Sequence, residues 1–167
     1  MKAQDPNEIF DIVDADDRVV GQATRAEVHA RKLFHRAVHI LIFTPGGTLI
    51  LQRRSLAKDT CPGLLSSSCA GHVDAGESYG FAALRELEEE LGISVQAEKH
   101  LEFVGMQKPS AENGFEFVRI YALRHGSLPI SRSIRAIRRS ALNSIRVTDC
   151  LPILTELPLL TYLTRIP

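Results

Sequence analysis

Residues 71–93 read GHVDAGESYGFAALRELEEELGI, and this stretch places one arginine and four glutamates within six consecutive residues. Glu86 precedes Glu90 by four positions, a spacing at which like charges destabilise a helix by about 0.2–0.5 kcal/mol per pair. Folding alone does not require such an arrangement. The stretch therefore indicates either a solvated acidic face or a set of carboxylates that binds a cation.

The spacing of the apolar residues predicts one amphipathic helix in this stretch. Ser78 is a suitable N-cap, and Gly92 is a suitable glycine for the C-terminal end. At about 100° per residue, the apolar side chains fall in one arc that is expected to pack on a sheet; they are Phe81, Leu84, Leu87 and Leu91.

The acidic residues are predicted on the far side of this helix. Glu86, Glu89 and Glu90 fall together there, and Arg85 precedes Glu89 by four residues. Glu88 falls at the edge of the apolar arc and is not expected to be a ligand. Hard carboxylate oxygens on one rigid face suit Mg²⁺ or Mn²⁺, whereas softer metals favour cysteine or histidine.

The fixed spacing across residues 71–93 resembles the Nudix box of the Nudix hydrolase superfamily. Its fixed positions are filled by Gly71, Glu77, Arg85-Glu86-Leu87, Glu89-Glu90 and Gly92-Ile93. The resemblance implies an α/β (α+β) fold, an α/β/α sandwich in which helices flank a mixed β-sheet. It also implies hydrolysis of a nucleoside or other organic diphosphate with Mg²⁺ or Mn²⁺.

The same resemblance implies a role for each fixed residue. The metal ligands would be Glu86, Glu89 and Glu90, with the backbone carbonyl of Gly71 completing a coordination shell. Arg85 would orient the ligands while paired with Glu77. Gly92 would support the box as the residue that ends its helix.

Length and composition set the remaining bounds. The 167 residues suffice for one domain with its own core, residues 1–167, of which 1–8 are expected to be flexible.

The formal net charge is zero, so no global field attracts polyanions and no nucleic-acid polymer is expected as a partner. Cys61, Cys69 and Cys150 fit neither a zinc site nor a disulfide framework and are expected to be free thiols. No apolar run approaches the roughly 18 residues that span a bilayer, and residues 1–14 lack the apolar core of a secretory signal, so a cytoplasmic protein without membrane contact is expected.

Hydrophobic periodicity predicts strands and helices that do not strictly alternate. Extended segments are expected over residues 9–13, 18–22, 37–43, 48–52, 64–70, 100–107 and 115–123. A capping box formed by Thr24 and Glu27 predicts a short helix through about residue 31. The last third is expected to contain a short strand near 134–138, a helix after Ser140 and a helix over 151–163.

From about residue 9 to residue 124 the chain also resembles the subgroup related to type 1 isopentenyl-diphosphate isomerase, which contains isomerases and hydrolases. The segments that carry this resemblance are FDIVDADDRVVGQATRAEVHARKLFHRAVHILIF (10–43), LILQRRS (49–55) and KDTCPGLLSSSCAGHVDAGES (58–78). The isomerases build a second metal site from histidines and glutamates. At or near the matching places stand His29, His35, His72 and Glu116, which either bind Mn²⁺ or Zn²⁺ or are structural.

The isomerase reaction needs an acid–base cysteine, which in that family immediately precedes the residue matching Gly71. This chain has Ala70 there. Cys69, one residue earlier, would point to the opposite face of an extended strand unless a bulge intervenes. The chain also lacks the tryptophan that the isomerases use, and its Nudix box is intact. These features favour a hydrolase; an isomerase-like enzyme and a non-catalytic Nudix-fold binding module are the alternatives.

The predicted reaction is metal-assisted attack of water on the diphosphate linkage of a small molecule. Glu89 and Glu116 are both candidates for the base, and the sequence does not choose between them. Cations that follow a strand could hold phosphate or be ordinary surface residues; they are Arg53, Arg54 and Lys58. The arginine-rich segment 132–146 is open to the same two interpretations. The N-terminal hairpin is a candidate homodimer edge.

Overall fold

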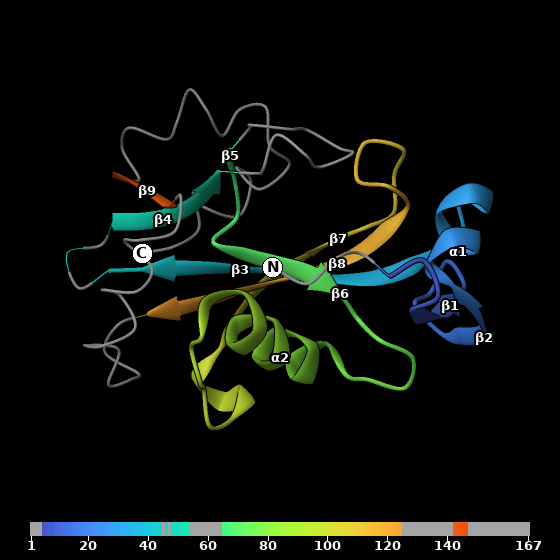
Figure 1. The fold of residues 1–167 in the computed structure, drawn as a ribbon, viewed down its shortest axis with the longest axis horizontal. Coiled ribbons are helices and arrows are strands. Elements are labelled where there is room, and N and C mark those ends of the chain that lie inside the picture. Colours follow the sequence, from blue (N-terminus) through green and yellow to red (C-terminus); the bar gives the residue numbers. More distant parts are fainter. Residues whose placement is uncertain (1–4, 45, 47, 54–64, 125–141, 147–167) are drawn as a thin grey trace.

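A computed structural model of the chain describes residues 5–44, 46, 48–53, 65–124 and 142–146, without the side chains of Arg53 and of residues 142–146 (Figure 1). The strands are β1 (Ile9–Val13), β2 (Val19–Thr24), β3 (His35–Phe43), β4 (Thr48–Arg53), β5 (Leu65–Ser66), β6 (Cys69–His72), β7 (Glu102–Gln107), β8 (Glu116–Arg124) and β9 (Leu142–Arg146). The helices are α1 (Arg25–Arg31), α2 (Tyr79–Leu91) and the short 3₁₀ helix η1 (Glu98–His100). No helix among the described residues is long and apolar enough to cross a bilayer.

A mixed sheet is the centre of the fold. Its strands run in the order β5-β4-β3-β8-β7, while β6 pairs with the first half of β3 and β9 pairs with β4. Only the pair β3–β8 is parallel among the described strands. Strands β1 and β2 form a separate hairpin, beside which α1 lies (Figure 1). The predicted α+β class with a mixed sheet is confirmed.

Two apolar clusters cover the two faces of the sheet. The cluster under α2 contains Val38, Ile40 and Ile42 of β3, which alternate with the residues of the opposite cluster, Ala37, Leu41 and Phe43. The alternation follows from the two-residue period of a strand. Because both faces of β3 are buried, the strand is apolar almost throughout, as its sequence predicts.

The predicted extended segment 64–70 is broken at Ser67 and Ser68. Ser68 leaves the ladder, and its hydroxyl accepts from the Ile42 N–H at 2.8 Å and donates to the Ile50 carbonyl. The hydroxyl therefore bridges β3 and β4 where β6 gives way to β4 as the neighbour of β3. The other predicted strands before residue 125 agree with the structure to within two residues at each end.

Helix α2 begins and ends where the sequence predicts, and Leu84, Leu87 and Leu91 of the predicted arc pack in the core, but Phe81 does not. The Ser78 hydroxyl accepts from the Phe81 N–H, and Gly92 adopts the left-handed conformation with φ 64°. Phe81, predicted in the buried arc, is 62% exposed. The buried residues of α2 are Tyr79, Gly80, Ala82, Ala83 and Leu87. Small residues let the helix approach the sheet closely on this side, which turns Phe81 outward.

The prediction of a helix after Ser140 is wrong. Residues Leu142–Arg146 form β9, which pairs with β4 from Thr48↔Arg146 to Gln52↔Leu142. Pairing with a strand some ninety residues earlier is a long-range effect that overrides local helix propensity. The strand predicted near 134–138 and the helix predicted over 151–163 lie outside the described residues.

Asp17 links the tip of the N-terminal hairpin to the rest of the fold through hydrogen bonds. Its carboxylate accepts from Arg36 Nε at 2.6 Å and from the Tyr79 hydroxyl at 2.9 Å. The guanidinium of Arg36 also lies over the Tyr79 ring, 5.3 Å from its centroid. One carboxylate thus joins the β1–β2 turn to β3 and to the first residue of α2.

Tyr79→Phe is expected to lower the free energy of unfolding by about 1–2 kcal/mol, because it removes a half-buried hydrogen bond to a carboxylate while keeping the ring. Urea denaturation measures this change. Tyr121→Phe is the matched control: Tyr121 is a buried tyrosine that packs on Phe103, and the expected change there is below about 0.5 kcal/mol. Equal losses in the two variants would contradict the role of Asp17.

Candidate functional site

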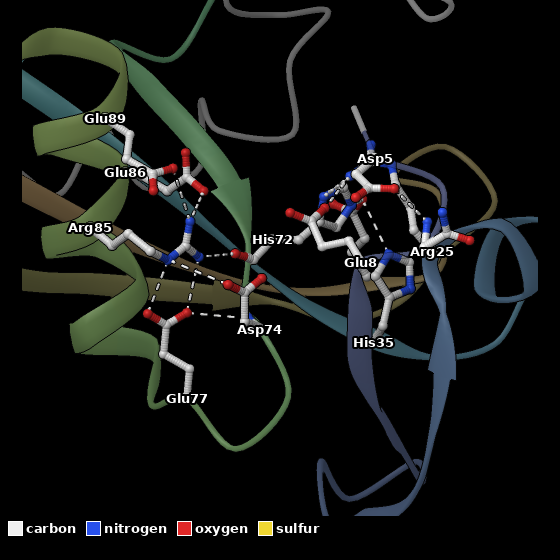
Figure 2. Close-up of polar contacts among 12 residues, drawn as sticks. Asp5, Glu8, Arg25, His35, His72, Asp74, Glu77, Arg85, Glu86 and Glu89 are labelled. Atoms are coloured by element: carbon white, nitrogen blue, oxygen red, sulfur yellow. Dashed lines mark hydrogen bonds and ion pairs between the residues drawn. The ribbon is translucent and has the colours of Figure 1, made fainter. Parts of the chain in front are cut away.

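Strand β6 directs two consecutive residues to opposite faces of the sheet. Gly71 pairs with Val38, which belongs to the cluster under α2, whereas His72 pairs with Ala37, which belongs to the cluster on the other face. Because side chains alternate along a strand, Gly71 faces α2 and the His72 ring faces away from it. A polar cluster lies on each side of β6 (Figure 2).

Arg85 is the centre of the cluster on the α2 side (Figure 2). Its Nε donates to Glu77 Oε1 at 3.1 Å and its Nη2 to Glu77 Oε2 at 2.9 Å, a bidentate contact. Nη1 lies 2.6 Å from Glu86 Oε1 and 3.6 Å from Glu89 Oε2. Nη2 also donates to the backbone carbonyl of His72 at 2.9 Å. Arg85 therefore fixes two glutamates and ties α2 to β6.

The carboxylate of Glu86 packs directly on the backbone of Gly71. A Cβ added to Gly71 would lie 2.1 Å from Glu86 Cδ and 2.2 Å from Oε1, so a larger residue cannot occupy this position without displacing the carboxylate. Burial raises the pKa of Glu86 to about 7; Arg85 opposes the rise, and Glu90 and Glu89 add to it. Arg85 supplies one positive charge to this group of carboxylates, and the remaining carboxylate oxygens are hard donors of the kind that a divalent ion prefers, so the donor set fits such an ion.

The prediction that the three carboxylates lie on the far side of α2 is wrong for Glu86 and Glu90. The Glu86 side chain is only 13% exposed, and Oε2 of Glu90 is inaccessible to solvent. Glu89 is 37% exposed. For Glu86 the reason is the glycine at position 71, which leaves room for its carboxylate between the helix and β6. The acidic residues thus line the edge where α2 meets this strand.

The Cys69 thiol also lies on the α2 side. Cys69 pairs with Ile40 and is fully buried. Burial, together with a hydrogen bond to Glu90 and the charge of Glu86, raises the pKa of the thiol well above its usual range. The pairing of β6 with β3 is regular from Cys69 to His72, so no bulge within it turns the thiol toward the His72 face, where Ala70 lies instead.

Three imidazoles gather on the other side of β6. His29 comes from α1, His35 from the start of β3 and His72 from the end of β6. One ring nitrogen of each lies within 4.8 Å of the corresponding nitrogens of the other two. The ring of Phe10 stacks on His72 at a centroid distance of 4.7 Å and on His35 at 5.9 Å. The grouping agrees with the places that the resemblance to the isomerase subgroup implies for these histidines.

Glu116, at the start of β8, completes the histidine cluster. Its Oε1 lies 3.2 Å from His72 Nε2 and 3.5 Å from His35 Nε2. His35 Nδ1 donates to the Leu33 carbonyl at 2.9 Å, so Nε2 is the ring nitrogen that faces the Glu116 carboxylate. That contact is favourable only when a proton or a cation lies between the two groups. The donor set therefore fits Mn²⁺ or Zn²⁺.

Electrostatics keep this cluster in a form that can bind a cation. Burial, reinforced by His72, His35 and Arg25, lowers the pKa of His29 to about 4. Burial also lowers the pKa of His72, against the opposing effect of Glu116. Burial alone would raise the pKa of Glu116, but hydrogen bonds from His35 and His72 outweigh it and hold that pKa well below its usual range. At neutral pH His29 and His72 are neutral and Glu116 is a carboxylate.

Asn113, in the loop between β7 and β8, holds the backbone of Glu116. Its Oδ1 accepts from the Ser110 N–H at 2.8 Å and from the Glu116 N–H at 3.2 Å. Its Nδ2 donates to the carbonyls of Lys108 and Glu116, both at 3.0 Å. Phe115 takes a left-handed backbone with φ 66°, a conformation that costs energy for an aromatic residue. The loop therefore presents Glu116 in a fixed position.

Asn113→Ala is expected to lower the free energy of unfolding by about 1–2 kcal/mol, because four hydrogen bonds of the loop lose their partner. Urea denaturation measures the loss. Asn7→Ala, at an exposed position, is the control, with an expected change within about 0.5 kcal/mol. If Asn113→Ala were as stable as this control, the loop would not depend on the amide.

Sequence reasoning missed Asn113 and two further residues at the site. Arg25 Nη1 lies 3.1 Å from His72 Nδ1 and 3.3 Å from Glu8 Oε2 (Figure 2). Asp11 accepts from the Gly76 N–H at 2.9 Å and so ties the 73–78 loop to the hairpin. The Asn-Gly pair at 113–114 is a turn signal that could have drawn attention to Asn113. No local signal marks Arg25 or Asp11, because their partners are distant in sequence.

Several predicted residues cannot be placed. Arg53 ends β4, but its side chain lies outside the described residues, as do Arg54 and Lys58 entirely. Cys61, Cys150 and the arginines of 132–139 also lie outside them. The proposed phosphate contacts of these cations stay predictions.

Comparison with known proteins places the chain in a family. Residues 33–130, more than half of the chain, match the family model described as the NUDIX domain. An uncharacterized Nudix hydrolase of Streptomyces coelicolor is 50% identical over 88 residues, which are 53% of this chain and 49% of that protein. An isopentenyl-diphosphate Delta-isomerase of Serratia proteamaculans is 42% identical over 93 residues, 56% of this chain and 52% of that protein. The chain spans about half the length of these curated relatives.

A solved structure agrees with this match over most of the chain. The crystal structure of DR0079 from Deinococcus radiodurans superposes with a TM-score of 0.67 at 27% identity, covering 89% of each chain. The residues that match the family model include the whole stretch 71–93, with its carboxylates gathered around Arg85. The chain therefore belongs to the Nudix family.

Proposed function

We propose that this protein is a hydrolase that cleaves the diphosphate linkage of a nucleotide-type or other organic diphosphate, with the help of a divalent cation. The proposal rests chiefly on the position of the Glu86 carboxylate, which packs on the Gly71 backbone and accepts a hydrogen bond from Arg85. The arrangement holds a carboxylate in a partly buried place next to other carboxylates, where a cation compensates its charge.

Glu86, Glu89 and Glu90 would hold Mg²⁺ or Mn²⁺, with the Gly71 carbonyl as a further oxygen. Hard divalent cations prefer such oxygen ligands. When bound, the ion would neutralise the charge of the diphosphate and make a water more acidic. The protein's own contribution is to fix these oxygens before the substrate arrives.

Arg85 positions these groups. Two of its nitrogens are occupied by Glu77 and one by Glu86, so its guanidinium is committed to the protein. Glu77 in turn accepts from the Asp74 N–H at 3.2 Å, which fixes the loop before α2. Rigid support of this kind keeps the ligand oxygens in place for catalysis.

Glu89 is a better candidate for the base than Glu116. Its side chain is 37% exposed, so water can reach the carboxylate. Glu116 is held by His35 and His72, which keep its pKa low and make it a weak proton acceptor. We therefore assign the proton transfer to Glu89 and a binding role to Glu116.

The cluster of His29, His35, His72 and Glu116 is proposed as a second cation site. Its support is the convergence of the three imidazoles, each with one ring nitrogen within 4.8 Å of the other two, beside the Glu116 carboxylate. Imidazole ligands favour Mn²⁺ or Zn²⁺ over Mg²⁺, so the two sides of β6 would differ in the cations that they bind.

A hydrolase is favoured over an isomerase by the position of the thiol. An acid–base cysteine at position 70 would face the histidine cluster, but Ala70 stands there and Cys69 faces α2. The chain also contains no tryptophan. Conversion of isopentenyl diphosphate to its isomer, followed by ¹H NMR, is expected to be absent. Conversion that is lost in Cys69→Ala would reverse this choice.

The proposal is tested with a panel of nucleotide sugars, dinucleotides, thiamine diphosphate and isoprenoid diphosphates. Each is incubated with Mg²⁺, with Mn²⁺ and with a chelator, and ³¹P NMR follows loss of the diphosphate and formation of phosphomonoesters or inorganic phosphate. At least one compound is expected to be hydrolysed only when a divalent ion is present. If none is hydrolysed and calorimetry shows ligand binding that does not depend on metal, the protein is a binding module instead.

A further inference from the structure

The His72 ring has both of its nitrogens engaged within the protein. Nδ1 lies 3.1 Å from Arg25 Nη1 (Figure 2), and Nε2 lies 3.2 Å from Glu116 Oε1. A guanidinium can only donate, so Nδ1 accepts from Arg25 and carries no proton. The proton of the ring therefore lies on Nε2, which donates it to the Glu116 carboxylate.

This tautomer leaves His72 without a lone pair for a cation. A neutral imidazole has one accepting nitrogen, and in His72 that nitrogen accepts from Arg25. In metal sites the nitrogen that does not bind the ion usually donates to a carboxylate or a carbonyl, which fixes the ligating tautomer. Arg25 has the reverse effect because it is itself a donor. His72 can therefore join His29 and His35 as a ligand only after Arg25 has moved.

Glu8 is in place as a second partner for Arg25. Its Oε2 lies 3.3 Å from the same Nη1 atom that contacts His72. The backbone N–H of Arg25 donates to the Glu8 carbonyl at 2.7 Å, so the two residues are held together. The Arg25 side chain is 14% exposed and lies over the Phe10 ring. Glu8 can thus retain the guanidinium when His72 releases it.

Solvent reaches the histidine cluster on the α1 side. His29 is exposed, whereas His35 is fully buried. The side chains of His72 and Glu116 are 17% and 18% exposed. An ion from solution can therefore enter beside His29, and the hydrogen bond from Arg25 is what opposes its contact with His72.

We infer that Arg25 controls cation binding at the histidine cluster by holding His72 in the non-ligating tautomer, and that Glu8 receives Arg25 when a cation binds. This inference rests on the proposed second cation site. While Arg25 occupies His72, the cluster offers only the remaining two imidazoles and one carboxylate. The complete site requires an ion that binds imidazole strongly enough to displace a charge-assisted hydrogen bond, which favours Zn²⁺ over Mn²⁺.

Calorimetry with Zn²⁺ tests the effect on affinity. Mg²⁺ is present in excess, because it occupies oxygen ligands and leaves imidazoles free; the Zn²⁺ step that is lost in His29→Ala belongs to the cluster. Arg25→Met keeps the length of the side chain without its donors, and it is expected to bind Zn²⁺ about tenfold to hundredfold more tightly, the value of a hydrogen bond to a charged group. Glu8→Gln is expected to bind it about twofold to fivefold more weakly, because Arg25 loses its second partner.

Arg31→Met is the matched control for this titration. It removes the same charge from an exposed position of α1, and its affinity is expected to stay within about twofold of the wild type, because exposed charges are screened by salt. Unchanged or weaker Zn²⁺ binding in Arg25→Met would overturn the inference. Equal tightening in Arg31→Met would assign the change to charge in general and would also overturn it.

Long-range ¹H–¹⁵N NMR of the metal-free protein gives a readout that needs no cation. The proton of His72 is expected on Nε2 in the wild type, and the Nδ1–H form is expected to appear in Arg25→Met. A wild-type ring with its proton on Nδ1 would overturn the inference. If Arg25→Met does not fold, the wild-type spectrum and Glu8→Gln decide, and unchanged Zn²⁺ affinity in Glu8→Gln would overturn it. Absence of the Zn²⁺ step from every variant would reject the second cation site together with this role of Arg25, whereas the diphosphate panel judges the hydrolase separately.

Discussion

Glu89→Gln is expected to lower Mg²⁺-dependent hydrolysis by about 10²–10⁴-fold, the usual contribution of a general base. Glutamine has nearly the same shape but cannot accept a proton, and it is a weaker ligand for a hard cation. The fold is expected to stay intact, because the Glu89 side chain is 37% exposed and glutamine has nearly the same shape. Initial rates at saturating Mg²⁺, together with the Tm, measure both effects.

Glu88→Gln is the control for this result. Glu88 is the preceding residue on α2; it is exposed and accepts from the Ser94 hydroxyl. It carries the same charge without facing the cluster around Arg85, so its variant is expected to keep activity within about twofold. Equal losses in Glu88→Gln and Glu89→Gln would indicate a general effect of charge and would contradict a specific role for Glu89.

Gly71→Ala is expected to lower hydrolysis by at least about 10²-fold, since displacement of a catalytic group by about 1 Å can have such an effect. The added Cβ would lie 2.1 Å from Glu86 Cδ, so the Glu86 carboxylate must move away from residue 71. Stability is also expected to fall by about 1–3 kcal/mol, as for other over-packed sites. Steady-state kinetics and urea denaturation measure the two losses.

Two further variants separate the causes of that loss. Gly21→Ala, in β2, adds a Cβ that would meet nothing within 4 Å, so its activity is expected to be unchanged. Gly71→Ala combined with Glu86→Asp shortens the displaced side chain, which is expected to restore stability without restoring activity. A fully active Gly71→Ala would show that the position of Glu86 does not matter.

Local signals predicted much of this fold. The Thr24–Glu27 capping box and the Ser78 and Gly92 caps lie where expected, because a cap depends on residues a few positions away. Strand β3 was recognised from its β-branched apolar run. Strand β9 was missed because its partner is β4, and no short-range pattern reports such a pairing.

The sequence predicted which residues form the candidate site better than it predicted the direction in which their side chains point. The spacing of the Nudix box identified Glu77, Arg85 and Glu86, which the structure brings together. Charge alone suggested a solvent-facing side for Glu86, but the glycine at position 71 makes room for it against β6. Burial of a carboxylate depends on a neighbouring strand, so the helix pattern could not reveal it.

The histidine cluster was predicted from the family resemblance and not from local sequence patterns. His29, His35 and His72 are scattered in sequence, and only the resemblance to the isomerase subgroup suggested that they meet; the structure does place them together. The residues that hold Glu116 in place were not predicted. Asn113 acts through the backbone of the loop, and such a role has no signature beyond a general turn propensity.

The most direct test of the account is to locate bound Mn²⁺ in a crystal of the wild-type protein by anomalous scattering. The account predicts a peak bounded by oxygens of Glu86, Glu89 and Glu90 and by the Gly71 carbonyl, and loss of that peak in Glu89→Gln. A map that shows Mn²⁺ only at the histidine cluster, or at neither place, would contradict the central claim that the carboxylates of α2 form the catalytic cation site.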